Sequence, residues 1–198
     1  MAFWTEGQLQ DPKRQYRFLV SLGGYDGSAQ WYAKQVSKPS LTISDTKHVY
    51  LNHSFYYPGR AEWSEISVTL VDPVSPDAAA ETAAIIQASG YVIPVDRRGV
   101  TTMSKVKAVG ALKNVIIRQI DSNGEALETW TLQNPFLKSV NFGDLNYEGD
   151  ALTNVTIGIR YDWATLETAT PASENADFDN GTFGVVGPLD NKFWSTEA

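Results

Sequence analysis

The stretch LTNVTIGIRYDW, residues Leu152–Trp163, carries the clearest fold signal in the chain. Its apolar and polar residues alternate, which places them on opposite faces of a β-strand. The apolar set is Val155, Ile157, Ile159 and Tyr161, and the polar set is Asn154, Thr156, Arg160 and Asp162. A strand with one apolar and one polar face is typical of an antiparallel sheet that is covered on one side only.

The same alternation recurs elsewhere in the chain. In Glu65–Val71, the side chains of Ile66, Val68 and Leu70 share one face, whereas Ser67 and Thr69 share the other. Further extended stretches are predicted at residues 16–22, 31–36, 41–51, 54–57 and 136–142. Turn signals at Gly23-Gly24, Pro58-Gly59 and Asp72-Pro73 separate several of them.

A β-hairpin is predicted in the second half of the chain. Asn114–Asp121 and Glu125–Gln133 are apolar-rich runs that flank Ser122-Asn123-Gly124. Asn-Gly between two such runs is a strong hairpin signal, and both turn residues are expected at positive φ.

One segment has the period of an α-helix. Ser75-Pro76-Asp77 is predicted to supply an N-cap, a first-turn proline and a first-turn acid, and the alanine-rich run that follows ends at Gly90. The helix is expected at about residues 76–89, while Ser104–Leu112 is either a short helix or part of a loop. The fold prediction is therefore a mainly β protein, an antiparallel sandwich or barrel with one flanking helix.

Composition limits the classes of function. The chain has 198 residues, 42% of them hydrophobic, and no cysteine, so it has neither disulfides nor a thiolate metal site. The N-terminus has no basic start followed by an apolar run, and no stretch is apolar for long enough to predict a membrane span. A formal net charge of −7 argues against tight phosphate binding.

Charge is unevenly distributed. Trp163–Ala198 has six acidic residues and one lysine, whereas Arg97–Arg118 has six basic residues and no acid. These segments are either complementary surfaces, within or between subunits, or two separately solvated segments. We expect residues 1–163 to form the β domain and residues 164–198 an extended acidic arm on a protein surface, with a mobile tail as the alternative. The arm contains Phe178, Phe183, Phe193 and Trp194.

No motif indicates catalysis. The nucleophile-elbow pattern GxSxG, the Walker A pattern and a GxGxxG that opens a helix are all absent from the sequence. His48 and His53 would lie on opposite faces of one strand unless a turn intervenes, and Asp144, Glu148 and Asp150 are expected in a solvated acidic loop. We therefore expect no catalytic, metal or cofactor site.

Several motifs resemble one known family when they are taken together in their order. In the first half these are Ser37-Lys38-Pro39-Ser40-Leu41, Tyr50–His53, Phe55–Arg60, Trp63 and the strand ISVTL at 66–70. In the second half they are Asp121–Glu125, Glu128–Leu132, Asn134-Pro135-Phe136, Phe142–Leu145 and Ile159–Trp163. Over about residues 16–163 the chain thereby resembles the tail tube proteins of contractile-tailed bacteriophages.

The resemblance implies a structural protein and no enzyme. Six subunits would form a ring whose inner wall is one continuous β-barrel, and rings would stack into a tube inside a contractile sheath. The implied partners are further copies of the chain, the sheath protein, the baseplate and the tail terminator. Genomic DNA would pass through the lumen without specific binding. The protein would be assembled in the host cytoplasm and belong to the virion tail.

The resemblance and the strand pattern together assign expected surfaces. The residues expected to face the lumen are Ser67, Thr69, Asn154 and Thr156. The residues expected between subunits are Pro58, Gly59, Arg60, Trp63, Arg97, Arg98, Lys105, Lys107, Phe178, Phe183, Phe193 and Trp194. The arm at 164–198 is expected to wrap the ring or bridge to the next one, and unchanged tube length and salt stability after its deletion would refute bridging.

Three alternatives remain open from the sequence. The same fold could serve a contractile injection or type VI secretion system that carries protein effectors. A monomeric β-barrel module that binds a small ligand and a hydrolase that uses Ser and His are the other two. Genome neighbours separate the two kinds of tube, and electron microscopy separates tubes from a lasting monomer.

Overall fold

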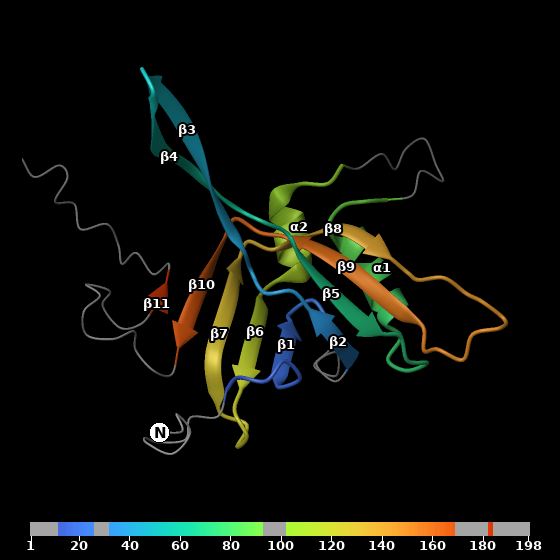
Figure 1. The fold of residues 1–198 in the computed structure, drawn as a ribbon. Helices are drawn as coiled ribbons and strands as arrows, with labels where there is room; N and C mark the ends of the chain where they lie inside the picture. The colour runs from blue at the N-terminus through green and yellow to red at the C-terminus, as the bar shows by residue number, and fades with distance from the viewer. Residues whose placement is uncertain (1–11, 26–31, 93–101, 169–181, 184–198) are drawn as a thin grey trace, which may run out of the picture.

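The computed structural model describes residues 12–25, 32–92, 102–168 and 182–183, and it is mainly β (Figure 1). The strands are β1 (Phe18–Leu22), β2 (Ala33–Val36), β3 (Leu41–Tyr50), β4 (His53–Trp63), β5 (Ile66–Val71), β6 (Val115–Ile120), β7 (Ala126–Gln133), β8 (Phe136–Asn141), β9 (Asn154–Arg160), β10 (Trp163–Thr168) and β11 (Thr182–Phe183). The helices are α1 (Ala78–Ala88) and α2 (Lys105–Leu112).

The strands form two antiparallel sheets and a separate hairpin. The first sheet has the order β1-β6-β7-β10-β11, the second has the order β2-β5-β9-β8, and β3 pairs only with β4. This architecture confirms the predicted mainly β, antiparallel fold. It contains a second helix, α2, where the sequence left a helix and a loop as alternatives, because Ser104 caps that segment by accepting a hydrogen bond from the Lys107 amide.

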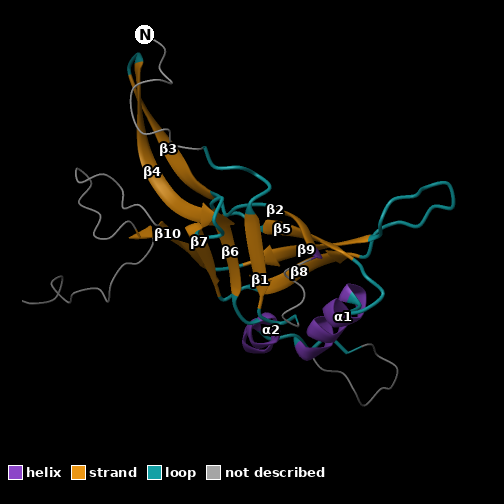
Figure 2. Cartoon of the chain, turned by 90° about the horizontal axis from the view of Figure 1, so that it is seen from below, coloured by secondary structure: helices purple, strands orange, loops and turns teal. Residues whose placement is uncertain are grey.

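One hydrophobic core lies between the two sheets. The alternating apolar residues predicted from the sequence point into it, and those of β5 and β9 are almost completely buried. Ile85 of α1 and Leu112 of α2 close the core at one end, where the two helices lie side by side (Figure 2). The burial of this apolar surface is the main driving force for the fold.

The start of α1 differs from the predicted cap. Asp77, rather than Ser75, is the N-cap, and its carboxylate accepts a hydrogen bond from the Ala80 amide at 2.9 Å. The carboxylate of Asp72 accepts further bonds from the Ala78 and Ala79 amides at 3.1 and 3.3 Å. Two carboxylates therefore satisfy amides that the first turn leaves without helical partners.

The predicted hairpin is confirmed, although its turn is built differently. β6 and β7 pair in antiparallel register on either side of residues 121–125. Gly124 has φ 87°, but Asn123 is not at positive φ. The Asp121 carboxylate instead accepts hydrogen bonds from the Asn123 and Glu125 amides at 2.7 and 2.8 Å, so that a side chain holds the loop.

The alternating stretch Leu152–Trp163 is divided between the two sheets. β9 ends at Arg160, and β10 begins at Trp163 in the first sheet, where it pairs with β7. Ala164 lies in the core, so the packed body continues through Thr168, beyond the boundary predicted at residue 163. A deletion that tests the arm therefore has to begin after Thr168.

A buried tyrosine fixes α1 to the body and gives a pH-dependent prediction. The Tyr25 hydroxyl bonds to Thr82 Oγ1 at 2.6 Å, and Thr82 Oγ1 donates to the Ala78 carbonyl at 2.7 Å. Burial raises the pKa of Tyr25 to about 12, whereas an unfolded tyrosine ionises near pH 10. The neutral phenol therefore stabilises the folded state below about pH 10, and this stability is lost as the pH rises towards about 12.

We expect Tyr25→Phe to cost about 1 kcal/mol at neutral pH, because the hydrogen bond to Thr82 is lost. Between about pH 10 and 12 the variant should lose about 2–3 kcal/mol less stability than the parent protein, because it has no buried phenol to ionise. Urea unfolding across that range measures both effects. Tyr147→Phe, at an exposed position, is the control, and equal pH profiles for the parent and Tyr25→Phe proteins would contradict the prediction.

Candidate assembly surfaces

The β3–β4 hairpin projects away from the two sheets as an arm (Figure 1). Residues Thr42–Tyr50 of β3 and His53–Glu62 of β4 are all exposed, and only Leu41 and Trp63, at the base, are partly buried. Beyond Trp63 at its base, the arm therefore adds nothing to the core. A long, two-stranded ribbon without such support is only marginally stable in water, which indicates that another surface covers it.

The ends of the hairpin differ from the sequence prediction. Pro58-Gly59 is not a turn, because both residues lie inside β4, next to a register shift between Ile43 and Asp45. The chain reverses at Leu51-Asn52, with Leu51 at φ 51°. A leucine seldom adopts positive φ, so Leu51 itself gives no turn signal.

Ser44 and Gly59 hold the irregular part of the hairpin together. Ser44 Oγ accepts a hydrogen bond from the Arg60 amide at 2.9 Å. A Cβ on Gly59 would lie 2.4 Å from that oxygen and 3.0 Å from the Ser44 carbonyl oxygen. Glycine is therefore required at residue 59 for close approach rather than for its φ angle.

We expect Gly59→Ala to displace the Ser44 hydroxyl and to remove its bond to the Arg60 amide, at a local cost of about 1 kcal/mol. Amide exchange at Arg60 should become several times faster, whereas global unfolding should hardly change because the hairpin lies outside the core. Gly149→Ala is the matched control, since the nearest atom to its new Cβ is 3.8 Å away. Unchanged exchange at Arg60 in Gly59→Ala would contradict this assignment.

Both faces of the hairpin expose large apolar side chains. The register pairs Tyr50 with His53, His48 with Phe55 and Thr46 with Tyr57, so these six residues form one face, which we call the His face. The opposite face carries the pairs Val49/Ser54, Lys47/Tyr56 and Asp45/Pro58. Tyr50, Phe55, Tyr56 and Tyr57 are each at least half exposed. If another surface covered only one face of the hairpin, the aromatic residues of the other face would stay in water.

The two histidines lie on the same face. The sequence placed them on opposite faces of one strand unless a turn intervenes, and the reversal at Leu51-Asn52 is such a turn. Tyr50 is directly opposite His53, and His48 lies two residues from Tyr50, so the histidines are diagonal neighbours across the two strands.

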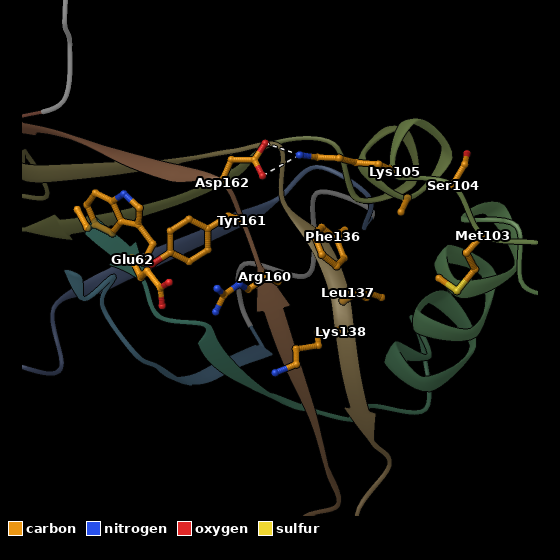
Figure 3. A pocket seen from close by; sticks show the side chains of 13 residues that line it. Glu62, Met103, Ser104, Lys105, Phe136, Leu137, Lys138, Arg160, Tyr161 and Asp162 are labelled. Carbon is orange, nitrogen blue, oxygen red and sulfur yellow. Dashed lines mark hydrogen bonds and ion pairs between the residues drawn. The ribbon is translucent and has the colours of Figure 1, made fainter. Parts of the chain in front are cut away.

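An open groove of about 860 Å³ lies at the base of the hairpin (Figure 3). Trp63 and Tyr161 form its aromatic wall, with ring centroids 6.0 Å apart, and the start of α2 lies across from them. Trp63 packs against the core of its own chain, although the sequence proposed it for subunit contacts. Its side chain is therefore only partly available to a neighbour.

Lys105 is also engaged within its own chain. Its ammonium group donates to both carboxylate oxygens of Asp162, at 2.8 and 2.6 Å, and the side-chain amide of Asn134 donates to the same carboxylate at 2.9 Å (Figure 3). The hydrogen bond from Lys105 lowers the pKa of Asp162, and Asn134 acts in the same direction. This group ties α2 to the corner between β9 and β10.

The four residues predicted to face the lumen lie together on the outer face of the second sheet. Thr69 pairs with Thr156, their hydroxyl oxygens 3.4 Å apart, Val71 pairs with Asn154, and Ser67 lies on the same face of β5. Gln35 on β2 and Asn141 on β8 extend the row on either side. These side chains are all uncharged. Charge on the sheet lies beside this row, at Arg160 at the end of β9, at the exposed Lys34 of β2, and at Lys138 of β8, which pairs with Glu65.

The other predicted contact residues are only partly described. Arg60 and Lys107 are exposed, on β4 and α2. The backbone of Phe183 pairs with Leu166 in the first sheet. Arg97, Arg98, Phe178, Phe193 and Trp194 lie outside the described residues. The subunit contacts of the whole set remain predictions.

Sequence reasoning gave no contact role to the β8–β9 loop, residues 142–153. The loop projects from the body, and its exposed apolar residues are Phe142, Leu145, Tyr147 and Leu152. Asp144, Glu148 and Asp150 are exposed, as expected for a solvated acidic loop. The sequence signal for a contact role was the presence of Leu145 and Tyr147 between the acidic residues Asp144 and Glu148.

Two features are absent from the part of the chain that the structure describes. No group of three or more His, Asp or Glu side chains is arranged there to hold a metal ion. Among the same residues, no helix has the length and apolar character to span a membrane.

Comparisons with known proteins give a fold but no sequence family. No family model and no curated protein matches the chain. Its structure is similar to the sheath/tube terminator of PVC, an extracellular contractile injection system, with a TM-score of 0.60 and 17% identity over 81% of this chain and 100% of that one. It is also similar to the tube-terminating cap of the anti-feeding prophage, with a TM-score of 0.59 and 19% identity over 85% of this chain and 100% of that one.

A chain of the PVC sheath-tube complex is similar as well, with a TM-score of 0.56 and 16% identity over 79% of this chain and 92% of that one. At these identities the likeness concerns the fold alone. The chain therefore has a tail-tube-like fold, of the kind found in the tube and tube-terminator components of contractile injection systems.

Proposed function

We propose that this chain is a structural subunit of the tail tube of a contractile-tailed phage, and that it has no catalytic role. Hexameric rings of the subunit stack into a hollow tube inside a sheath, and the tube conducts DNA into the host. The observation that carries the proposal is the β3–β4 hairpin, which exposes apolar side chains on both faces and reaches the core of its own chain only through Trp63 at its base. Such a ribbon needs other subunits to cover it.

The second sheet fits the inner wall of such a ring. It has four strands, so six copies joined through the edges of β2 and β8 would form a closed wall of 24 strands without free edges. The row around Thr69 and Thr156 consists of hydroxyl and amide groups without charge, which offers phosphate no strong attraction. A lumen lined with Lys and Arg in the assembled particle would refute this placement.

The proposed partners follow from the same role. They are further copies of the chain, the sheath, the baseplate and the tail terminator, and the place of the protein is the virion tail after assembly in the host cytoplasm. A second candidate is the tube subunit of a protein-carrying injection system, which is favoured by the matched structures from extracellular contractile injection systems. Cargo co-purified with intact particles, DNA or protein, distinguishes the two.

Electron microscopy of the purified full-length chain tests the proposal, with analytical ultracentrifugation to measure its mass. Six-fold rings or stacked tubes are expected as concentration rises. A protein that stays monomeric at all concentrations, and also in the presence of sheath protein, would overturn the proposal and favour a monomeric binding module.

A further inference from the structure

We propose that the ion pair between Lys38 and Glu128 positions the β3–β4 hairpin on the body of the subunit, and that assembly depends on this pair. The inference rests on the proposed self-assembly and adds to it which side chains hold the hairpin in its direction. Lys38 and Glu128 are positioning residues, because neither lies on the hairpin itself: Lys38 lies between β2 and β3, and Glu128 lies in β7.

The hairpin leaves the body where the β-ladder is interrupted. The register of β2 with β5 ends at Val36, and the register of β3 with β4 begins at Leu41. Residues 37–40 and, on the returning strand, residues 64–65 connect the two ladders, and we call these two segments the hinge. Pro39 has no amide with which to continue a ladder. The hinge is therefore the place where the hairpin can change its direction relative to the sheets.

Lys38 joins the hinge to the first sheet. Its ammonium group donates to Glu128 Oε2 on β7 and to Gln119 Oε1 on β6, both at 2.6 Å. The side chain of Glu128 is only 14% exposed, and Gln119 is only 8% exposed. Because water reaches these acceptors so little, the pair is screened less than an ion pair in open solvent.

Further contacts hold the two acceptors in place. Lys13 also binds the carboxylate of Glu128, and the side-chain amide of Gln119 donates to the Arg14 carbonyl at 3.3 Å. Burial raises the pKa of Glu128, but the hydrogen bonds from Lys13 and Lys38 outweigh it, and the pKa lies below its ordinary value. The carboxylate is therefore ionised at neutral pH and is held from two sides.

A second ion pair reaches the other half of the hinge but should matter less. Lys138 of β8 pairs with Glu65. The two side chains are 55% and 48% exposed, so water and salt screen their attraction. Exposed pairs of this kind usually add little. The direction of the hairpin therefore depends on Lys38 more than on Lys138.

A small rotation at the hinge becomes a large displacement at the tip of the hairpin (Figure 1). β3 has 10 residues. At about 3.3 Å per residue, such a strand is about 33 Å long, and a rotation of about 10° at its base moves its tip by about 6 Å. Side chains stay in contact only within about 4 Å. A hairpin that swings this far would lose its place on a neighbouring copy.

Spin labels on dilute monomer test the positioning directly, because the chain has no cysteine of its own. Asn52→Cys labels the tip of the hairpin, and Ser122→Cys or Ala84→Cys labels the body in two different places, all at exposed positions. Pulsed electron paramagnetic resonance measures the distance from the tip to each body site. Lys38→Met keeps the aliphatic stem but removes the charge, and at least one distance distribution should become about twice as broad, because the tip is free to swing.

Matched variants separate positioning from a general effect on the cluster. Lys13→Met removes the other lysine from Glu128 and leaves Lys38 in place, so its distances should equal those of the parent protein. Lys38→Arg should restore the parental distances, because a guanidinium group can donate to both acceptors. If Lys13→Met and Lys38→Met broadened the distances equally, the cluster would only stabilise the body, and the proposal would be overturned.

Sedimentation of the same variants tests the link to assembly. The concentration at half-maximal assembly should rise about tenfold in Lys38→Met, which corresponds to a modest loss of binding free energy. It should change by less than about twofold in Lys13→Met, Lys38→Arg and Lys138→Met. Urea unfolding of each variant confirms that the body remains folded at the concentrations used.

The outcomes separate this inference from the proposed function. Parental distances in Lys38→Met would overturn the positioning role and leave the tube role intact. Broader distances with unchanged assembly would overturn the dependence of assembly on the pair. A parent chain that never associates would overturn the proposed function, whereas the distances in the monomer would still decide whether Lys38 positions the hairpin.

Discussion

Shortening the β3–β4 hairpin is expected to abolish tube formation and to leave a folded subunit. Ile43 pairs with Ala61, so an Asn-Gly turn can join these residues in place of Ser44–Arg60. Every residue removed is exposed, and none belongs to the core. The melting temperature should therefore move by only a few degrees.

Assembly should respond very differently, because the removed ribbon carries the exposed aromatic residues on which the contacts between copies depend. Sedimentation and electron microscopy should show monomers, or at most single rings, at concentrations where the parent chain forms tubes. A control variant that replaces only Leu51-Asn52 by Asn-Gly keeps the full hairpin and should still assemble. Tubes of normal length from the shortened chain would contradict the role given to the hairpin.

A matched pair of isoleucine substitutions is expected to separate the fold from the assembly surface. Ile157 is 0% exposed and pairs with Val68 and Val140 on the two neighbouring strands. Ile157→Ala removes three buried carbons and leaves a cavity at the centre of the second sheet, which should cost about 2–5 kcal/mol. This is a large part of the stability of an ordinary domain, and expression of the variant should fall.

Ile43→Ala makes the same chemical change on the hairpin, where the side chain is 58% exposed. It should change the free energy of unfolding of the monomer by no more than about 0.5 kcal/mol. Urea unfolding of dilute monomer measures both variants, and sedimentation at high concentration measures assembly. If both substitutions lowered the free energy of unfolding equally, the Ile43 side chain would have to be packed in the monomer, which would contradict its exposure in this structure.

The periodic parts of the fold could be predicted from the sequence. The alternation in residues 65–71 and 152–163 identifies the apolar faces of β5 and β9, and the Asn-Gly signal locates the β6–β7 hairpin. Alternation in the sequence predicts burial directly, because successive side chains of a strand point to opposite faces and only one face packs against the core. The division of 152–163 between two sheets was not visible, since the sequence does not show to which sheet a strand belongs.

The assembly surface was harder to predict for a physical reason. The reversal at Leu51-Asn52 has neither Gly nor Pro, so the sequence gave the strands 41–51 and 54–57 no hairpin turn and placed a turn at Pro58-Gly59. Exposure of the aromatic residues depends on the absence of any other element beside the ribbon, which is a property of the whole fold. The four polar residues of β5 and β9, in contrast, were brought together as alternation predicts.

The separation of the β3–β4 hairpin from the core has an evolutionary consequence. In most proteins a mutation that alters a binding surface also disturbs the packing beneath it, so that new specificity comes at a loss of stability. Here there is no packing beneath the surface, because both faces of the arm are in solvent in the single subunit. Residues along the arm can therefore diverge together with their partner surfaces while the two sheets stay unchanged. Lineages of such a protein should differ most along this arm and least at positions such as Val68, Val155 and Ile157.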